Sequence, residues 1–235
     1  MAKTVVFDFG GVLCVEPSRR PRDLRTAKEM LNEIGLHYSD EQLQETVNNG
    51  MKKYKEFSYQ TQRELEERQI IRDYIFSGLH ETEKQKITAM ADELFYEIDS
   101  GSHTLKIGDD VKETLLELKE RGYRLGLISN TVSPNVKDFL KREGFDGIFE
   151  FQIYSHEEGV KKPSKQLFEK AQKFLGLKPE ECAYVGDTFD KDVAGAHGAG
   201  WGAAILMDYS GKHTDKGEAD YKIKDFKELL EIFPE

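Results

Sequence analysis

The chain has 235 residues and a formal net charge of −10 at pH 7, which argues against nucleic acid as the main partner because phosphate backbones are bound by positively charged surfaces. We expect neither a membrane span nor a secretory peptide, since no run of about 18 apolar residues occurs and Met1-Ala2-Lys3 leads directly into a strand-like run. Cys14 and Cys182 are too few for a disulfide framework, so we expect reduced thiols and a cytoplasmic protein.

The chain opens with a short strand and then changes character. Residues 4–7 are mostly apolar and β-branched, and Asp8-Phe9-Gly10-Gly11 follows, which is typical of a buried strand that ends in a turn. The polar residues 16–21 include two prolines and indicate a hinge. From about residue 22 to residue 100 apolar side chains recur at helical spacing, and this segment predicts helices without a strand.

Several local patterns place the helices of this segment. A stripe of apolar residues at helical spacing predicts the first helix, and Gly35 closes it. Ser39 to Gln42 and Thr82 to Gln85 both fit capping boxes, in which a polar side chain and the backbone satisfy each other at a helix start. Residues 64–76 predict a further helix between these two.

After residue 100 the pattern alternates between helices and strands. The expected helices cover residues 109–121, a segment starting at Ser133-Pro134 and ending at Gly144, residues 165–175, a segment ending at Ala199, and the last residues to Phe233. The expected strands are residues 123–128, 151–154, 183–185 and 202–206, with a last one near residue 220.

Strands that alternate with helices of this length predict a parallel sheet covered by helices on both faces. The expected fold class is therefore α/β, with a Rossmann-like core formed by residues 1–16 and 101–235. Residues 17–100 are expected to form a small, all-helical cap domain. An insertion directly after the first strand lies at the carboxyl ends of the strands, which is where open α/β sheets bind ligands.

The expected strand ends lead to a set of polar residues that should meet at one edge: Asp8, Ser129 with Asn130, the pair Lys161-Lys162, and Asp187. Two close carboxylates raise each other's pKa unless a cation neutralises them, and oxygen ligands suit Mg²⁺. Lysine, serine and a backbone amide can hold phosphate oxygens. Because an aspartate can act as a nucleophile toward phosphorus, these residues predict Mg²⁺-assisted phosphoryl transfer through Asp8.

The whole chain resembles the haloacid dehalogenase superfamily, in its subgroup with a helical cap inserted after the first strand. Four motifs carry this resemblance, and they occur in the family's order. They are V-V-F-D-F-G-G-V-L at residues 5–13, L-I-S-N-T at 127–131, V-K-K-P at 160–163 and V-G-D-T-F-D-K-D at 185–192.

The resemblance implies roles for particular residues. Asp8, Ser129 and Lys162 would be catalytic, with Ser129, the Asn130 amide and Lys162 holding phosphate. The expected Mg²⁺ ligands are Asp8, the carbonyl group of Gly10, Asp187 and Asp192. Asp192 has two open interpretations, since it could bind the metal through water or hold Lys162 in place.

One position departs from the family's pattern. In most phosphatases of the family the residue two positions after the nucleophile is also Asp, and it protonates the leaving group and then activates water. Here that residue is Gly10, whose carbonyl oxygen can still bind Mg²⁺. General acid–base catalysis contributes about 10²–10⁴-fold, so its absence bears on the reaction itself. Because sugar-phosphate mutases of the family rely on this Asp, Gly10 argues against a mutase.

The leading hypothesis is a Mg²⁺-dependent phosphatase of a small phosphomonoester, such as a sugar phosphate, acting through an aspartyl-phosphate on Asp8. Dehalogenases and phosphonate hydrolases of the family also lack the second Asp and stay open as alternatives; the latter would need a Schiff-base lysine such as Lys52 or Lys53. A phosphometabolite-binding protein with weakened catalysis is the third interpretation. The expected partner is a small phosphorylated metabolite, without nucleic acid or membrane, and the chain is expected to be a monomer or homodimer.

Overall fold

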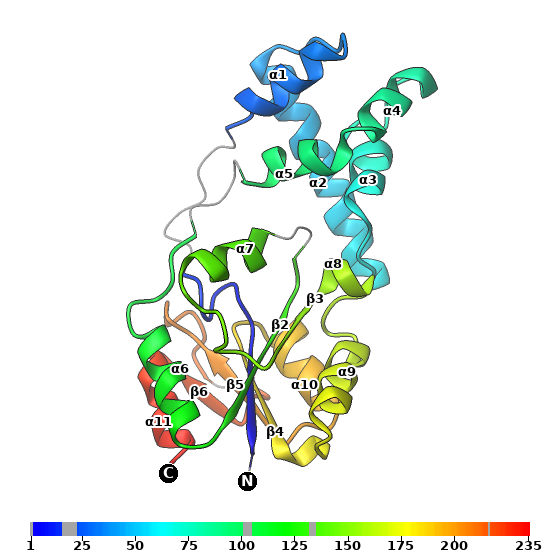
Figure 1. Cartoon of the computed structure of the whole chain (residues 1–235). Coiled ribbons are helices and arrows are strands. Elements are labelled where there is room, and N and C mark those ends of the chain that lie inside the picture. The colour runs from blue at the N-terminus through cyan, green and yellow to red at the C-terminus, as the bar shows by residue number, and fades with distance from the viewer. Residues whose placement is uncertain (1, 16–22, 101–104, 132–134, 216) are drawn as a thin grey trace. The chain divides into compact units, whose positions relative to one another are not determined.

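The computed structural model describes residues 2–15, 23–100, 105–131, 135–215 and 217–235. The chain divides into two compact units (Figure 1). The α/β unit comprises Met1–Pro17, Leu105–Thr131 and Val136–Glu235, and the helical unit comprises Ser18–Thr104 and Val132–Asn135. The expected hinge at residues 16–21 and the expected helix start at Ser133-Pro134 lie outside the described residues.

The α/β unit is built on a six-stranded sheet in the order β3-β2-β1-β4-β5-β6, and all of its pairings are parallel. The α/β fold class expected from the sequence is therefore confirmed. The chain first places β2 and β3 on one side of β1 and then places β4, β5 and β6 on the other side. The strand order therefore reverses between β1 and β4, and the carboxyl ends of these two strands form the topological switch point, where open α/β sheets bind ligands. The strands are β1 (Thr4–Phe7), β2 (Arg124–Ser129), β3 (Phe151–Tyr154), β4 (Cys182–Gly186), β5 (Ala203–Met207) and β6 (Tyr221–Ile223).

Helices cover both faces of this sheet (Figure 1). In the central strand, Val5 and Phe7 belong to one apolar cluster and Val6 to another, as the alternation of side chains along a strand requires. The first cluster includes side chains of α6 (Val111–Glu120), α7 (Asn135–Arg142) and α11 (Leu229–Ile232). The second includes side chains of α9 (Lys165–Leu175) and α10 (Ala194–Gly198). Shorter helical segments are α8 (Ser155–Glu158), η2 (Pro179–Glu181), η3 (Phe189–Val193) and η4 (Phe226–Glu228).

The helical unit has an apolar core of its own. Its elements are α1 (Arg25–Glu33), α2 (Asp40–Thr61), α3 (Glu67–Gln69), the π-helix η1 (Ile70–Ile75), α4 (Glu81–Thr88) and α5 (Ala91–Ser100). The capping box at Ser39 is confirmed, because its side chain accepts from the Gln42 amide while the Gln42 side chain accepts from the Ser39 amide.

Two of the expected helix starts in this unit were wrong. The helix expected from residue 64 begins at Glu67, because Glu64 is instead buried with its carboxylate accepting a hydrogen bond from the Tyr54 hydroxyl. The next helix was expected to have Thr82 as its capping residue, but α4 begins at Glu81 and its capping residue lies two positions before Thr82. Glu83 accepts a hydrogen bond from the backbone amide of His80 at 3.0 Å, which makes His80 the capping residue.

Gly50 gives the helical unit a steric requirement that can be tested. A Cβ atom there would lie 2.3 Å from Cα of Ile75, so α2 and η1 approach too closely for alanine. We expect Gly50→Ala to lower the free energy of unfolding by about 1–3 kcal/mol, since overpacking outweighs the helix propensity that alanine gains. Urea denaturation followed by circular dichroism would measure the change. Gly78→Ala, where a Cβ has no neighbour within 4 Å, is the control and should change stability little.

Candidate active site

Asp8 follows directly on the last residue of β1 and begins a tight turn. Leu13 and Cys14 both donate their backbone N–H to the carbonyl oxygen of Phe9, at 3.0 and 2.8 Å. The Asp8 carboxylate is oriented through one oxygen, since Oδ1 accepts hydrogen bonds from the Phe9 amide and from Lys162 Nζ, both at 2.8 Å. Among the described residues, no hydrogen-bond donor is assigned to Oδ2. This oxygen is therefore available to attack an electrophile or to bind a cation.

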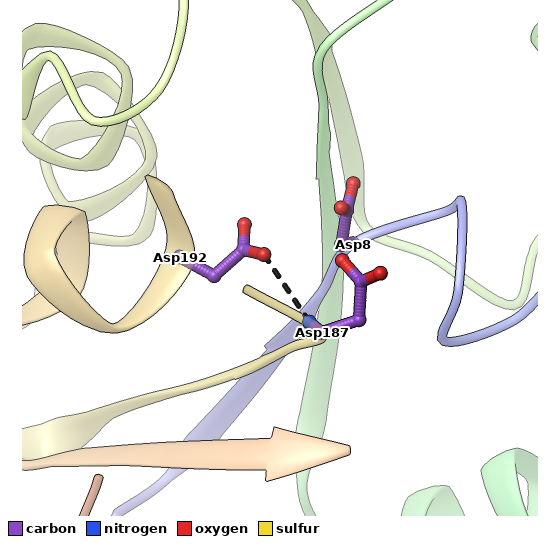
Figure 2. Close-up of side chains that lie close together, drawn as sticks. All are labelled: Asp8, Asp187 and Asp192. Atoms are coloured by element: carbon purple, nitrogen blue, oxygen red, sulfur yellow. Dashed lines mark hydrogen bonds between the residues drawn. The ribbon is translucent and has the colours of Figure 1, made fainter. Parts of the chain in front are cut away.

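Three carboxylates lie together at this edge of the sheet, as Figure 2 shows. Asp8, Asp187 and Asp192 each offer an oxygen, and the three oxygens lie within 4.8 Å of one another. Asp187 follows the end of β4, and Asp192 lies in η3. The topology places Asp8 and Asp187 next to each other because β1 and β4 are paired neighbours in the sheet.

Two glycines make room for two of these carboxylates. Gly11 has a φ of +74°, and a Cβ atom on it would lie 2.3 Å from Oδ2 of Asp187. At Gly186 a Cβ atom would lie 2.2 Å from Cβ of Asp192. A larger residue at either position would displace a carboxylate of the site.

Lys162 is the buried cation among the carboxylates. Its ammonium group lies 2.8 Å from Oδ1 of Asp8 and 2.7 Å from Oδ1 of Asp192. The side chains of Lys162 and Asp192 are each 1% exposed, while that of Asp8 is 13% exposed. Of these three side chains, Asp8 is therefore the one that a ligand can reach most easily.

Asn130 holds the backbone around Lys162. Its side-chain oxygen accepts from the Lys162 amide at 2.8 Å, and its side-chain nitrogen donates to the Lys162 carbonyl oxygen at 3.2 Å. Both ends of the side-chain amide are thus used within the protein. Ser129, the last residue of β2, is buried.

Asp192 is fixed by hydrogen bonds to both of its oxygens. Oδ1 accepts from Lys162, and Oδ2 accepts from the Asp187 amide at 3.2 Å and from Thr188 through its amide at 3.0 Å and its hydroxyl at 2.7 Å. Figure 2 draws the bond to Asp187. Of the two interpretations left open by the sequence, these contacts favour the one in which Asp192 holds Lys162 in place.

Burial and charge shift the acidities of these groups. Burial raises the pKa of Asp8, and the negative charge of Asp192 raises it further, against the opposing effect of Lys162. Burial raises the pKa of Asp187 to about 7, and the charges of Asp8 and Asp192 add to this effect. Burial alone would lower the pKa of Lys162, but the Asp192 and Asp8 carboxylates outweigh it and raise that pKa. Lys162 therefore stays charged at neutral pH.

The donor set fits a hard divalent cation. The described part of the site holds three carboxylates and one ammonium group, which contacts two of them, so full ionisation leaves excess negative charge in a largely buried place. All of the offered ligand atoms are oxygens, which Mg²⁺ prefers. Burial, and after it the charges of Asp8 and Asp192, raise the pKa of Asp187, so a proton can partly replace the missing positive charge.

This imbalance predicts that Asp187 destabilises the metal-free protein. Because its folded-state pKa lies above the ordinary value, ionisation costs stability progressively as the pH rises from about 4 through about 7. We expect metal-free Asp187→Asn to melt roughly 2–8 °C above the wild type at pH 8, with a smaller difference at pH 5.

Thermal melts in EDTA at the two pH values would measure this, with Asp190→Asn as the control because Asp190 is exposed and lies in the same motif. A variant that melts below the wild type at pH 8 would contradict the argument. Added Mg²⁺ should raise the melting temperature of the wild type more than that of Asp187→Asn.

The comparison with protein families agrees with this geometry. Residues 2–200 match the model of the haloacid dehalogenase-like hydrolases. The chain belongs to this family. The resemblance found in the four motifs is thereby confirmed, and so is the expectation of a hydrolase.

Individual relatives refine this assignment. Glyceraldehyde 3-phosphate phosphatase of Methanopyrus kandleri is 30% identical over 243 residues, which cover 100% of this chain and 98% of that protein. The crystal structure of a 2-haloacid dehalogenase from Pseudomonas syringae superposes with a TM-score of 0.69 at 23% identity, over 99% of this chain and 98% of that one. A haloacid dehalogenase-type phosphatase from Thermococcus onnurineus gives a TM-score of 0.64 at 22% identity, over 98% and 97%.

The Methanopyrus kandleri relative supports the expectation of a phosphatase. The likeness to the two solved structures, at 22–23% identity, bears on the fold alone. A separate expectation concerned membranes. In the described part of the chain, none of the helices has both the length and the apolar character that a membrane crossing requires.

Proposed function

We propose that this protein is a Mg²⁺-dependent phosphatase that hydrolyses a small phosphomonoester through an aspartyl-phosphate on Asp8. The observation that carries the proposal is the orientation of Asp8. Oδ1 is held by the Phe9 amide and Lys162, while Oδ2 belongs to a side chain that is 13% exposed and has no hydrogen-bond donor assigned among the described residues. A fixed carboxylate with one available oxygen is suited to nucleophilic attack.

In the proposed first step, Oδ2 of Asp8 forms a bond to phosphorus as the bond from phosphorus to the leaving oxygen breaks. Ser129, the backbone amide of Asn130 and Lys162 bind the phosphoryl oxygens. Mg²⁺, held by Asp8, the Gly10 carbonyl and Asp187, would neutralise the charge of the phosphoryl group. Water then attacks the phosphorus of the aspartyl-phosphate, which releases phosphate and restores Asp8.

We further propose that residues 17–100 act as a cap domain that selects the substrate, with residues 1–16 and 101–235 as the catalytic core. The chain leaves and re-enters the α/β unit beside the nucleophile turn. The Val15 amide donates to the Lys106 carbonyl oxygen at 2.9 Å, and the Gly108 amide donates to the Leu13 carbonyl oxygen at 3.1 Å. An insertion that starts from this edge of the sheet is suited to selecting what reaches Asp8.

Gly10 limits the substrates that such a site can hydrolyse quickly. It has no side chain to protonate a leaving group, and apart from its two chain neighbours no described residue has an atom within 4 Å of where its Cβ would stand. The space that a side chain at position 10 would occupy is therefore not filled by another described side chain. Substrates whose leaving group departs readily without a proton, such as sugars phosphorylated at the anomeric carbon, fit this site best.

The proposed activity predicts Mg²⁺-dependent release of phosphate from a panel of sugar phosphates, nucleotides and phosphorylated acids. EDTA should abolish the release, and Asp8→Asn should lower it by about 10³-fold or more, because the nucleophile is lost. Asp190→Asn is the matched control and should retain activity. Activity on no ester, or full activity of Asp8→Asn, would overturn the proposal. Metal-independent release of halide from a 2-haloacid would instead indicate a dehalogenase.

The argument from Gly10 predicts a gain of function. Gly10→Asp should raise turnover of alkyl phosphates by about 10–100-fold, because the new carboxyl group can protonate a poor leaving group. Turnover of p-nitrophenyl phosphate, whose leaving group needs no proton, should change little. Gly10→Asn has a side chain of similar size without the acid and is the control. Equal rates of Gly10→Asp and Gly10→Asn on alkyl phosphates would contradict the argument.

A further inference from the structure

We propose that Tyr184 is a positioning residue for the catalytic lysine, because its hydroxyl group fixes the ammonium group of Lys162 beside Asp8. The geometric part of this inference concerns the α/β unit alone. Its kinetic consequence rests on the proposed phosphatase activity.

The contacts of the Tyr184 hydroxyl define its role. Tyr184 lies in the middle of β4 and is 1% exposed, and its oxygen lies 2.8 Å from Lys162 Nζ and 2.8 Å from the carbonyl oxygen of Ile128. A phenol has one proton, and the carbonyl oxygen can only accept. The proton is therefore directed at Ile128, and the phenol oxygen accepts a hydrogen bond from Lys162.

This bond completes the hydrogen bonding of the ammonium group. An ammonium group has three N–H donors. The acceptors present are Oδ1 of Asp8, Oδ1 of Asp192 and the hydroxyl oxygen of Tyr184, all within 2.7–2.8 Å. The two carboxylates supply the charge, and the phenol supplies a third fixed direction. With all three in place, Lys162 has one orientation.

The ring of Tyr184 is itself held in place. Its centroid lies 5.1 Å from that of Phe168 and 6.1 Å from that of Trp201, with steep angles between the ring planes. Gly195 allows this packing, because a Cβ atom there would lie 2.4 Å from the Phe168 ring. The hydroxyl group therefore has little freedom to follow Lys162. The rigid partner sets the position of the flexible one.

Without the hydroxyl group, two buried polar groups would lose a partner. Lys162 would have one N–H without an acceptor, and the Ile128 carbonyl oxygen would lose its side-chain donor. The ammonium group would then shift toward the two carboxylates that remain. Because Lys162 is expected to stabilise charge on the phosphoryl oxygens as it develops, such a shift should lower kcat more than it changes KM.

The first experiment compares Tyr184→Phe with the wild type in steady-state kinetics. We expect kcat to fall about tenfold and KM to change less than twofold. Tyr154→Phe is the matched control, since Tyr154 is also a buried strand tyrosine but donates to Gln152 instead of contacting Lys162. In a Lys162→Gln background, Tyr184→Phe should lower kcat less than twofold further. A tenfold fall in that background too would show a general packing role and overturn the proposal.

The second experiment does not depend on activity, and the dispersion of the amide signals in the same samples shows that each variant is folded. In spectra of lysine-¹⁵N-labelled wild-type protein, Lys162 should give a slowly exchanging ammonium signal, which Lys162→Gln identifies by its loss. Tyr184→Phe should broaden or remove this signal, and Tyr154→Phe should retain it. The absence of the signal in the wild type, or an unchanged signal in Tyr184→Phe, would contradict the proposal. If the signal behaves as expected but no ester is hydrolysed, the positioning role stands and the phosphatase proposal fails.

Discussion

The buried pairing of Lys162 with Asp8 and Asp192 is the interaction on which the candidate site depends. A buried ammonium group is stable only when its charge and all of its donors are satisfied, and here two carboxylates and a phenol do this. The same pairing holds one oxygen of Asp8 and leaves the other available. The orientation of the proposed nucleophile and the charge of the lysine therefore have one physical cause.

This cluster still has more negative than positive charge. Asp187 adds a third carboxylate that the lysine does not balance, and its raised pKa shows the cost. Gly11 and Gly186 permit this crowding, because a side chain at either position would overlap a carboxylate. The protein thus maintains an arrangement that is unfavourable without a cation, as is common where stability has been given up for function.

The sequence predicted the fold and the meeting of Asp8 with Asp187 because these follow from local patterns. A strand that ends in a polar residue brings that residue to a known edge of a parallel sheet, and so Asp8 and Asp187 could be placed together. Tyr184 could not be assigned a role in this way, since a tyrosine inside an apolar strand looks like core. Its contact with Lys162 spans 22 positions of the chain and depends on packing from both sides. The side chain of Asn130 was missed for a similar reason, because its partner is a backbone 32 positions away.

The central claim is that Asp8 forms a covalent bond to phosphorus. Its most direct test is rapid acid quenching of the protein during turnover of a hydrolysed ester with Mg²⁺, followed by mass spectrometry of the peptide that contains Asp8. The account predicts a phosphoryl group on Asp8 in the wild type and none in Asp8→Asn. Sustained turnover with a phosphoryl group on another residue, or with no phosphorylated protein at any quench time, would contradict it.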